Sequence, residues 1–191
     1  MALFASLILA TTLASTSTLP TYALTDGETW SFRVKAKADI QPYSYSGLMT
    51  IKFDQKPDSK WIMSINHKEE MEMNGEKGPG NQTLAVWEVT PDLKPTGSGQ
   101  GANVFGEQLM GSLFLPSQAE ERAPLFGMNP LFVTKVEEEK ERLKVTSNIK
   151  DTSGDHTVER WLDAKTRKLL QIRCVSSSAI GKITYELLPV K

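Results

Sequence analysis

The sequence contains little cysteine and little histidine, and it has no excess of charge of either sign. Cys174 is the one cysteine among 191 residues, so the chain cannot build an internal disulfide framework or a zinc site made of cysteines. Lysine and arginine together number 22, and aspartate and glutamate number 23, which supplies no basic field for a nucleic acid. We therefore expect no nucleic-acid partner. The hydrophobic fraction of 39% is sufficient for one core in a domain of this size.

Charged side chains are missing from residues 1–23. An apolar run from Ala2 to Ala10 is followed by threonines and serines and then by Thr21-Tyr22-Ala23. This order predicts a signal peptide cleaved after Ala23, because an apolar segment followed by small residues is typical of secretory signals. The run is shorter than a membrane-spanning helix, which needs about 20 apolar residues. We therefore expect residues 24–191 to be exported to the periplasm or the extracellular space, with an uncleaved anchor or an internal core segment as the alternatives.

Residues of the mature chain alternate between apolar and polar with a period of two. Trp30, Phe32, Val34 and Ala36 alternate with polar residues, as in a half-buried strand. The alternation recurs in residues 49–53, 61–65, 85–89, 143–149, 158–162, 170–174 and 183–187, with turn residues between them. About nine or ten short strands predict one all-β, mainly antiparallel domain over residues 24–191, built as a sheet, a sandwich or a barrel.

Residues 91–130, which we call the crossover, differ from the rest of the domain. They contain five prolines and the run Gly97-Ser98-Gly99-Gln100-Gly101, so regular strand pairing is not expected there. Residues 102–115 predict one short helix with a densely apolar end. An apolar, glycine-flanked segment between two sets of strands is either a connection packed on the sheet or a lid over a cavity. We favour the packed connection.

The overall pattern resembles that of bacterial periplasmic lipoprotein-carrier proteins. The resemblance rests on a cleavable signal, an opening Gly27-Glu28-Thr29-Trp30 strand, the apolar proline-bounded crossover, and Trp161-Leu162-Asp163 before Leu169-Leu170. It implies a strongly curved sheet or half barrel of about nine or ten strands with one short helix or lid-like insert. In that family the concave face takes up acyl chains. The resemblance covers most of the mature chain in style and includes no specific motif.

These observations favour an extracytoplasmic binding protein that holds an apolar or acyl ligand on the concave face of a curved sheet. The alternative is a non-catalytic structural or interaction module of the cell envelope with a closed core and an envelope protein as its partner. We expect no enzyme activity, no cofactor and no metal, and a hydrolase is the third hypothesis, which no constellation of residues supports. The side chains expected to bind an apolar small molecule or lipid are Trp61, Met63, Ile65, Trp87, Phe105, Leu109 and Phe114.

Two patterns resemble ligand sites but lack the required context. Residues 97–102 match the G-x-G-x-x-A pattern of dinucleotide loops, but no buried strand precedes them, so we interpret them as a flexible loop. His67, Met71 and Met73 offer the soft ligands that suit Cu(I), although a straight strand would separate His67 from Met71 by about 13 Å. A methionine-lined core is the preferred interpretation.

Three further features are interpreted as structural. His156 and Asp155 lie in an expected turn, and no nucleophile elbow accompanies them. The charged residues 137–142 predict a solvated hairpin and not a pair of catalytic carboxylates. Cys174 alternates with apolar residues and should face the core, with pairing between chains as the alternative. Residues 81–83 fit a glycosylation acceptor, which matters only in a eukaryotic host.

Overall fold

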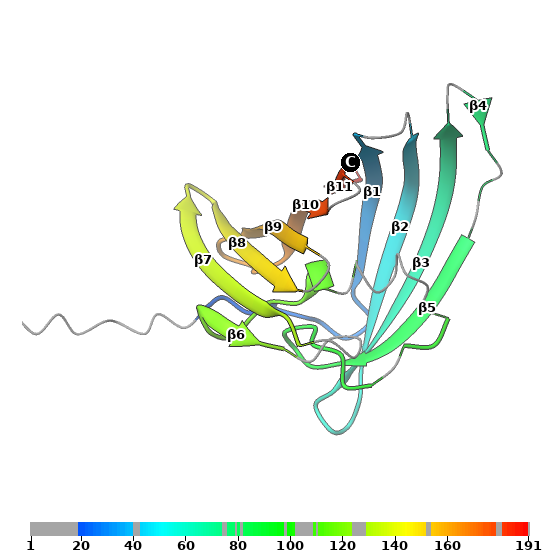
Figure 1. Ribbon diagram of the computed structural model, residues 1–191. Helices are drawn as coiled ribbons and strands as arrows, with labels where there is room; N and C mark the ends of the chain where they lie inside the picture. Colours follow the sequence, from blue (N-terminus) through cyan, green and yellow to red (C-terminus); the bar gives the residue numbers. More distant parts are fainter. Residues whose placement is uncertain are drawn as a thin grey trace, which may run out of the picture.

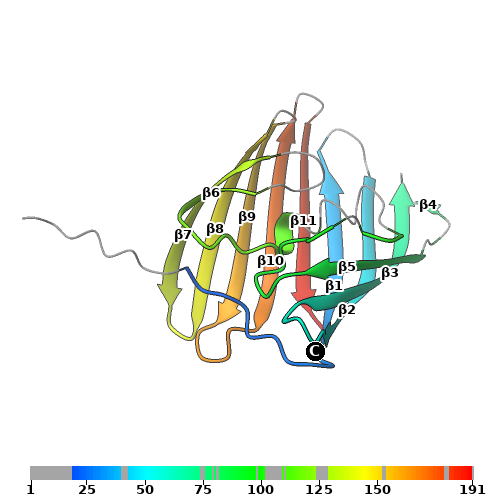
Figure 2. The ribbon, with the colours of Figure 1, turned by 90° about the horizontal axis from the view of Figure 1, so that it is seen from below.

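A computed structural model of the chain describes residues 19–39, 43–73, 76–78, 80, 82–97, 99–101, 109, 111–123, 129–151, 154–178 and 181–190. All of the strands in this part of the chain belong to one antiparallel sheet that is not closed (Figures 1 and 2). The strands are β1 Thr29–Ala38, β2 Tyr43–Gln55, β3 Trp61–Met73, β4 Glu76–Lys77, β5 Gln82–Val89, β6 Glu120–Arg122, β7 Leu131–Glu139, β8 Arg142–Asp151, β9 Gly154–Asp163, β10 Leu169–Ser178 and β11 Gly181–Pro189.

The sheet is a meander whose two halves join at the first and last strands. Its order is β4-β3-β2-β1-β11-β10-β9-β8-β7-β6, and β5 pairs with β3. β4 and β5 lie along the same edge of β3, because β4 pairs with residues 72–73 and β5 with residues 61–68. They therefore act as one interrupted edge strand, which leaves ten strand positions. The expected antiparallel, strongly curved sheet is confirmed.

Apolar residues of alternate parity form the core. On β1, Trp30, Phe32 and Val34 are buried, whereas the residues between them are exposed. This face of the sheet curves around the crossover (Figure 1). The tight turns that follow β2, β7 and β9 contain residues of positive φ, namely Ser59, Lys140 and Arg167. The solvated hairpin expected at residues 137–142 is present between β7 and β8.

The crossover covers both edges of the sheet. Its first part returns along β5, where Val86 and Gln100 exchange two backbone hydrogen bonds of 2.9 Å each. Its last part contains β6, which pairs with β7. The expectation that residues 91–130 contain no regular pairing is therefore wrong. The physical reason for this pairing is that unpaired edge strands favour association with other chains and are normally covered. The fully open edges of an isolated half barrel are thus avoided.

The helix predicted over residues 102–115 is described only in its C-terminal part. Among the described residues of the crossover, 109 and 111–113 are helical, and Phe114 lies beyond the helix. Residues 102–108 and 110 lie outside the part of the chain that the structure describes. No helix among the described residues is long and apolar enough to cross a membrane.

The segment before β1 is part of the core. Tyr22 is 5% exposed, its ring lies 5.4 Å from that of Trp30, and its hydroxyl donates a 2.7 Å hydrogen bond to the carbonyl of Leu113 in the crossover. Cleavage after Ala23 would remove this side chain. The folded domain therefore includes Tyr22, which the sequence placed in the predicted signal peptide.

This inference gives a test of the N-terminal boundary. A chain that begins at residue 19 should be more stable than one that begins at residue 24 by about 3 kcal/mol, because the shorter chain loses a buried aromatic ring and a buried hydrogen bond. Urea unfolding of both chains measures the difference. The Tyr22→Phe variant of the longer chain should lose about 1 kcal/mol, since only the hydrogen bond is removed. Equal stability of the two chains would contradict a core role for Tyr22.

Candidate functional site

The apolar residues that we expected to bind a ligand lie in one hydrophobic cluster, except for Phe105, which lies outside the described residues. Met63 on β3 is the cross-strand neighbour of Trp87 on β5. Trp61 and Ile65 share this face of β3, because alternate residues of a strand point to the same side. The exposed fractions are 6% for Trp61, 0% for Met63, 4% for Ile65, 1% for Trp87, 1% for Leu109 and 0% for Phe114.

The crossover links this cluster to the other half of the sheet. The ring of Phe114 packs edge to face against Phe132 of β7, with centroids 5.2 Å apart. Leu93, Leu113 and Leu115 are also buried, with exposed fractions of 1% or less. The described part of the crossover therefore supplies a second layer of the core and packs on the concave face.

The two cavities that the structure describes open on the opposite face of the sheet. Their volumes are about 520 and 830 Å³. They are lined by outward-facing residues such as Lys35, Ser46 and Lys68, and by none of the expected ligand-binding residues. Because the described candidate residues are buried in one cluster with residues of the crossover, an apolar ligand that contacted them would have to displace side chains of the crossover.

A buried arginine attaches the crossover to the sheet. Arg160 of β9 is 0% exposed. Its Nε donates to the carbonyl of Ser112 at 2.6 Å, its Nη2 to the carbonyl of Gly111 at 3.4 Å, and its Nη1 to Ser147 Oγ at 2.9 Å. The carbonyls at the C-terminal end of a helix carry partial negative charge and favour a cation. Burial lowers the pKa of Arg160 from its usual value, and the guanidinium remains the protonated form in proteins.

Neighbouring polar groups complete this attachment. Ser147 Oγ also lies 2.9 Å from Thr134 Oγ1 on β7. Burial raises the pKa of Tyr185 well above its usual value and that of Cys174 to about 11. Cys174 is buried and faces the core, as the alternation predicted. Because its thiol stays protonated at neutral pH, Cys174 is a poor nucleophile in the folded chain.

Sequence reasoning placed Arg160 on the apolar face of a strand but gave it no role. The sequence feature that could have revealed its role is a single cation between Val158 and Leu162, which are both buried. A charge in that position needs hydrogen-bonding partners in the core. The pattern alone could not identify these partners, because they come from backbone carbonyls of the crossover.

His67 is a second buried polar side chain on the core face. It is 1% exposed, its Nδ1 lies 3.1 Å from Glu69 Oε1, and burial lowers its pKa to about 4. Gly47 provides the necessary space, because a Cβ there would approach His67 Nε2 to 2.9 Å. The side chains of Met71 and Met73 lie outside the described residues, so the copper interpretation is not tested. No group of three or more His, Cys, Asp or Glu that could hold a metal occurs in the described part of the chain.

His156 forms a cross-strand hydrogen bond with Ser176. The Nδ1–Oγ distance is 2.7 Å, and the two residues are paired in register between β9 and β10. Asp155 is the next residue along the strand, so it takes the opposite face of the sheet. These three residues therefore do not adopt the arrangement of a Ser/His/Asp triad, in which the aspartate side chain contacts and orients the histidine ring.

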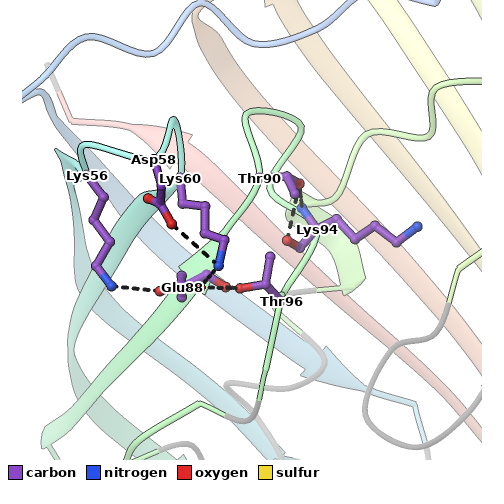
Figure 3. A network of polar contacts seen from close by, with 7 residues as sticks. All are labelled: Lys56, Asp58, Lys60, Glu88, Thr90, Lys94 and Thr96. Atoms are coloured by element: carbon purple, nitrogen blue, oxygen red, sulfur yellow. Dashed lines mark hydrogen bonds and ion pairs between the residues drawn. The ribbon is translucent and has the colours of Figure 1, made fainter.

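A polar network at the end of β5 was not anticipated from the sequence (Figure 3). The Glu88 carboxylate accepts hydrogen bonds from Lys56 and Lys60 at 2.7 Å each and from the Thr96 hydroxyl at 2.9 Å. The hydrogen bond from Lys56 contributes most to lowering the pKa of Glu88 to about 2. These contacts tie the β2–β3 turn to β5 and to the start of the crossover. No cleft accompanies them among the two described cavities, and we assign them a structural role.

The glycine-rich run packs on the β5 edge and is not a phosphate-binding loop. A Cβ at Gly99 would come within 2.0 Å of Trp87 Nε1, and a Cβ at Gly101 within 2.2 Å of the Leu84 carbonyl oxygen. Gly101 also has a φ of 72°, a conformation that favours glycine. The glycines therefore allow the crossover to approach β5 closely, which the interpretation as a flexible loop did not include.

Comparisons with known proteins identify no relative: no family profile, no curated protein and no solved structure matches the chain.

The attachment by Arg160 can be tested by removing its side chain. Arg160→Ala should lower the free energy of unfolding by about 3 kcal/mol, because the buried carbonyl of Ser112 and the half-buried carbonyl of Gly111 lose their donor and a cavity forms. Arg173→Ala is the matched control: Arg173 lies on the outer face with a 45% exposed side chain, and its loss should cost less than about 1 kcal/mol. Urea unfolding measures both changes. A similar small effect of the two substitutions would show that Arg160 does not hold the crossover.

The buried His67 predicts a dependence of stability on pH. In the unfolded chain its pKa is 6.5, and in the folded chain it is about 4. Between these values the unfolded chain binds more protons, so stability falls as the pH is lowered. The loss from pH 7 to pH 5 should be about 2 kcal/mol.

Urea unfolding of the parent chain and of His67→Gln at both pH values measures this effect, and the variant should show a flatter dependence. Burial raises the pKa of Glu69, which shifts stability in the opposite direction in both proteins. Parallel pH dependence of the two chains would exclude His67 as the cause.

Proposed function

We propose that this protein is an extracytoplasmic, non-catalytic binding protein that takes up an apolar or acyl ligand between the concave face of its sheet and the crossover. The observation that supports this proposal is the nature of the cover. The concave face is covered by one connecting segment with very little regular structure among its described residues, and not by a second sheet. Binding sites commonly lie beneath such segments, because their displacement disrupts few backbone hydrogen bonds.

The chemistry of the cover supports an apolar ligand. The buried crossover residues Leu109, Leu113, Phe114 and Leu115 contact a face of the sheet that is itself apolar. An acyl chain that replaced these side chains would bury a similar apolar area on the strands, so the hydrophobic contribution of the strand residues would be retained. The cost is the exposure of the displaced side chains and the loss of the hydrogen bonds from Tyr22 and Arg160 to the crossover.

A second candidate function is favoured by the filled core. The six described candidate residues are between 0% and 6% exposed, so they offer little accessible surface to a ligand unless neighbouring side chains move. A non-catalytic interaction module of the cell envelope needs no such movement. The two functions differ in one respect, namely whether the crossover can leave the concave face while the sheet remains folded.

Two measurements distinguish these functions. Native mass spectrometry of the protein purified from an exporting host, followed by organic extraction, should reveal a copurifying lipid or fatty acid. Titration with a dansylated fatty acid should give saturable binding. Hydrogen exchange should then change in residues 109–123 and remain unchanged in the β8–β9 hairpin, since the proposal places the movement in the crossover.

A pair of tryptophan substitutions locates the site. Trp61→Ala should weaken binding of the dansylated fatty acid at least about fivefold, because it removes about 1–2 kcal/mol of apolar contact. Trp161→Ala is the control, since Trp161 lies on the outer face beside Lys144, and it should change affinity less than twofold. Thermal unfolding verifies that both variants are folded. A protein that carries no lipid and shows no saturable binding of the probe would exclude the carrier function and favour the interaction module.

A further inference from the structure

The outer face of the sheet contains a groove formed by the two adjoining cavities. They share the lining residues Ser46, Glu70 and Lys77, and together they extend from β10 across β11, β1, β2 and β3 to β4. We call this feature the outer groove. It lies on the face opposite the core, so its side chains are independent of the hydrophobic cluster.

The outer groove has a strongly positive lining in a chain whose net charge is −1. Among the described residues, six cations line it together with two carboxylates of the same face, those of Glu70 and Glu186. Glu69 also lines it, but its carboxylate lies 3.1 Å from His67 on the core side. A hollow lined by one sign of charge concentrates the potential and attracts ligands of the opposite sign. The six cations are Arg33, Lys35, Lys37, Lys68, Lys77 and Arg173.

Arg33, Lys35 and Lys37 of β1 form a central row among these cations, and among the described residues no salt bridge within 4.0 Å joins this row to a carboxylate. These three residues alternate along the outer face of β1 and are exposed. Some lysines elsewhere do have such a partner, as in Lys144–Glu159 and Lys168–Glu28 at 2.7 Å each. Lys35 lies directly across from Glu186 on β11, whereas Arg33 and Lys37 have no carboxylate directly across from them on either neighbouring strand.

The spacing of the row suits a chain of repeated negative charges. Side chains on the same face of a strand recur every 6.6 Å or so, and β1 is held at this spacing because it pairs with both β2 and β11. Ser44 and Thr184 flank Lys37 on the two neighbouring strands and line the same cavity, so hydroxyl donors accompany the cations. We propose that the outer groove binds a linear sulfated polysaccharide.

A hollow groove favours a chain over a flat membrane surface. An anionic membrane would be contacted by a protruding or flat basic patch, whereas Lys77 and Arg173 stand at opposite ends of the lining, with Ser46 between them. Backbone order in the paired strands also lowers the cost of binding, since the cations need no rearrangement of the sheet. The proposal is independent of the apolar ligand, because it concerns the other face.

The experiment measures binding of a fluorescein-labelled heparin oligosaccharide to the full chain by anisotropy. The parent protein should bind at about 20 mM salt, and the dissociation constant should rise at least tenfold at about 300 mM salt, because ion release drives such complexes. Lys35→Glu with Lys37→Glu should weaken binding at least tenfold. The control is Lys135→Glu with Lys165→Glu, which changes the net charge equally at exposed positions outside the groove and should weaken binding less than threefold.

Three results would overturn the proposal. The first is that the folded parent protein does not bind the oligosaccharide at low salt. The second is that the two double variants weaken binding equally. The third is that the protein binds anionic but not neutral lipid vesicles through Lys35 and Lys37 and has no affinity for the oligosaccharide. The last result would identify a membrane-binding face. Melting temperatures show that each variant is folded. A failure here would leave uptake of the dansylated fatty acid unchanged, so it is distinguishable from failure of the proposed carrier function.

Discussion

The hydrogen bonds from Arg160 to the crossover are the constraint on which the filled concave face depends. A guanidinium that is 0% exposed loses its hydration, and this cost is offset only when its donors are satisfied within the protein. Here two donors reach the carbonyls of Gly111 and Ser112 and a third reaches Ser147. Since Ser147 is also bonded to Thr134 on β7, one side chain connects three strands to the crossover. Apolar contacts alone would allow Leu113 and Phe114 to slide across the sheet, because such contacts have no direction.

The crossover solves two problems that an open antiparallel sheet creates. One is the exposure of the apolar face, which Leu93, Leu109 and Phe114 cover. The other is the presence of two free edges, which the crossover pairs through Gln100 on β5 and β6 on β7. A second sheet would cover the face but add further edges. One segment that pairs with both edges and packs on the face is therefore sufficient for a single domain. These two roles also explain why the crossover combines glycine, proline and dense apolar residues.

Period-two alternation predicted eight of the strands and their apolar faces, because a strand repeats every two residues whatever its neighbours are. It did not predict β4, β6 or β7. It was not sufficient for contacts between segments distant in the chain. Tyr22 was placed in a cleaved signal, yet its hydroxyl bonds to Leu113. Gly99 was interpreted as part of a flexible loop, yet it packs on Trp87. The candidate site shows the same limit: the six described residues do lie in one cluster, but whether that cluster encloses a space depends on the path of the crossover, which has no periodic pattern.

The two faces of the sheet place different energetic demands on a ligand. On the outer face, Arg33, Lys35 and Lys37 are positioned by a strand paired on both sides, so an anion meets donors whose backbone is already ordered and the cost of binding is low. On the concave face, the proposed apolar ligand would first have to displace side chains held by Arg160 and Tyr22, and its apparent affinity would be reduced in proportion to the fraction of molecules in which the crossover is displaced. Because alternate residues of β1 serve opposite faces, a substitution at Lys35 leaves Val34 and its core contacts in place. Binding at the outer groove can therefore change in evolution or in an experiment without altering the core, whereas any change at the concave face affects stability and binding together.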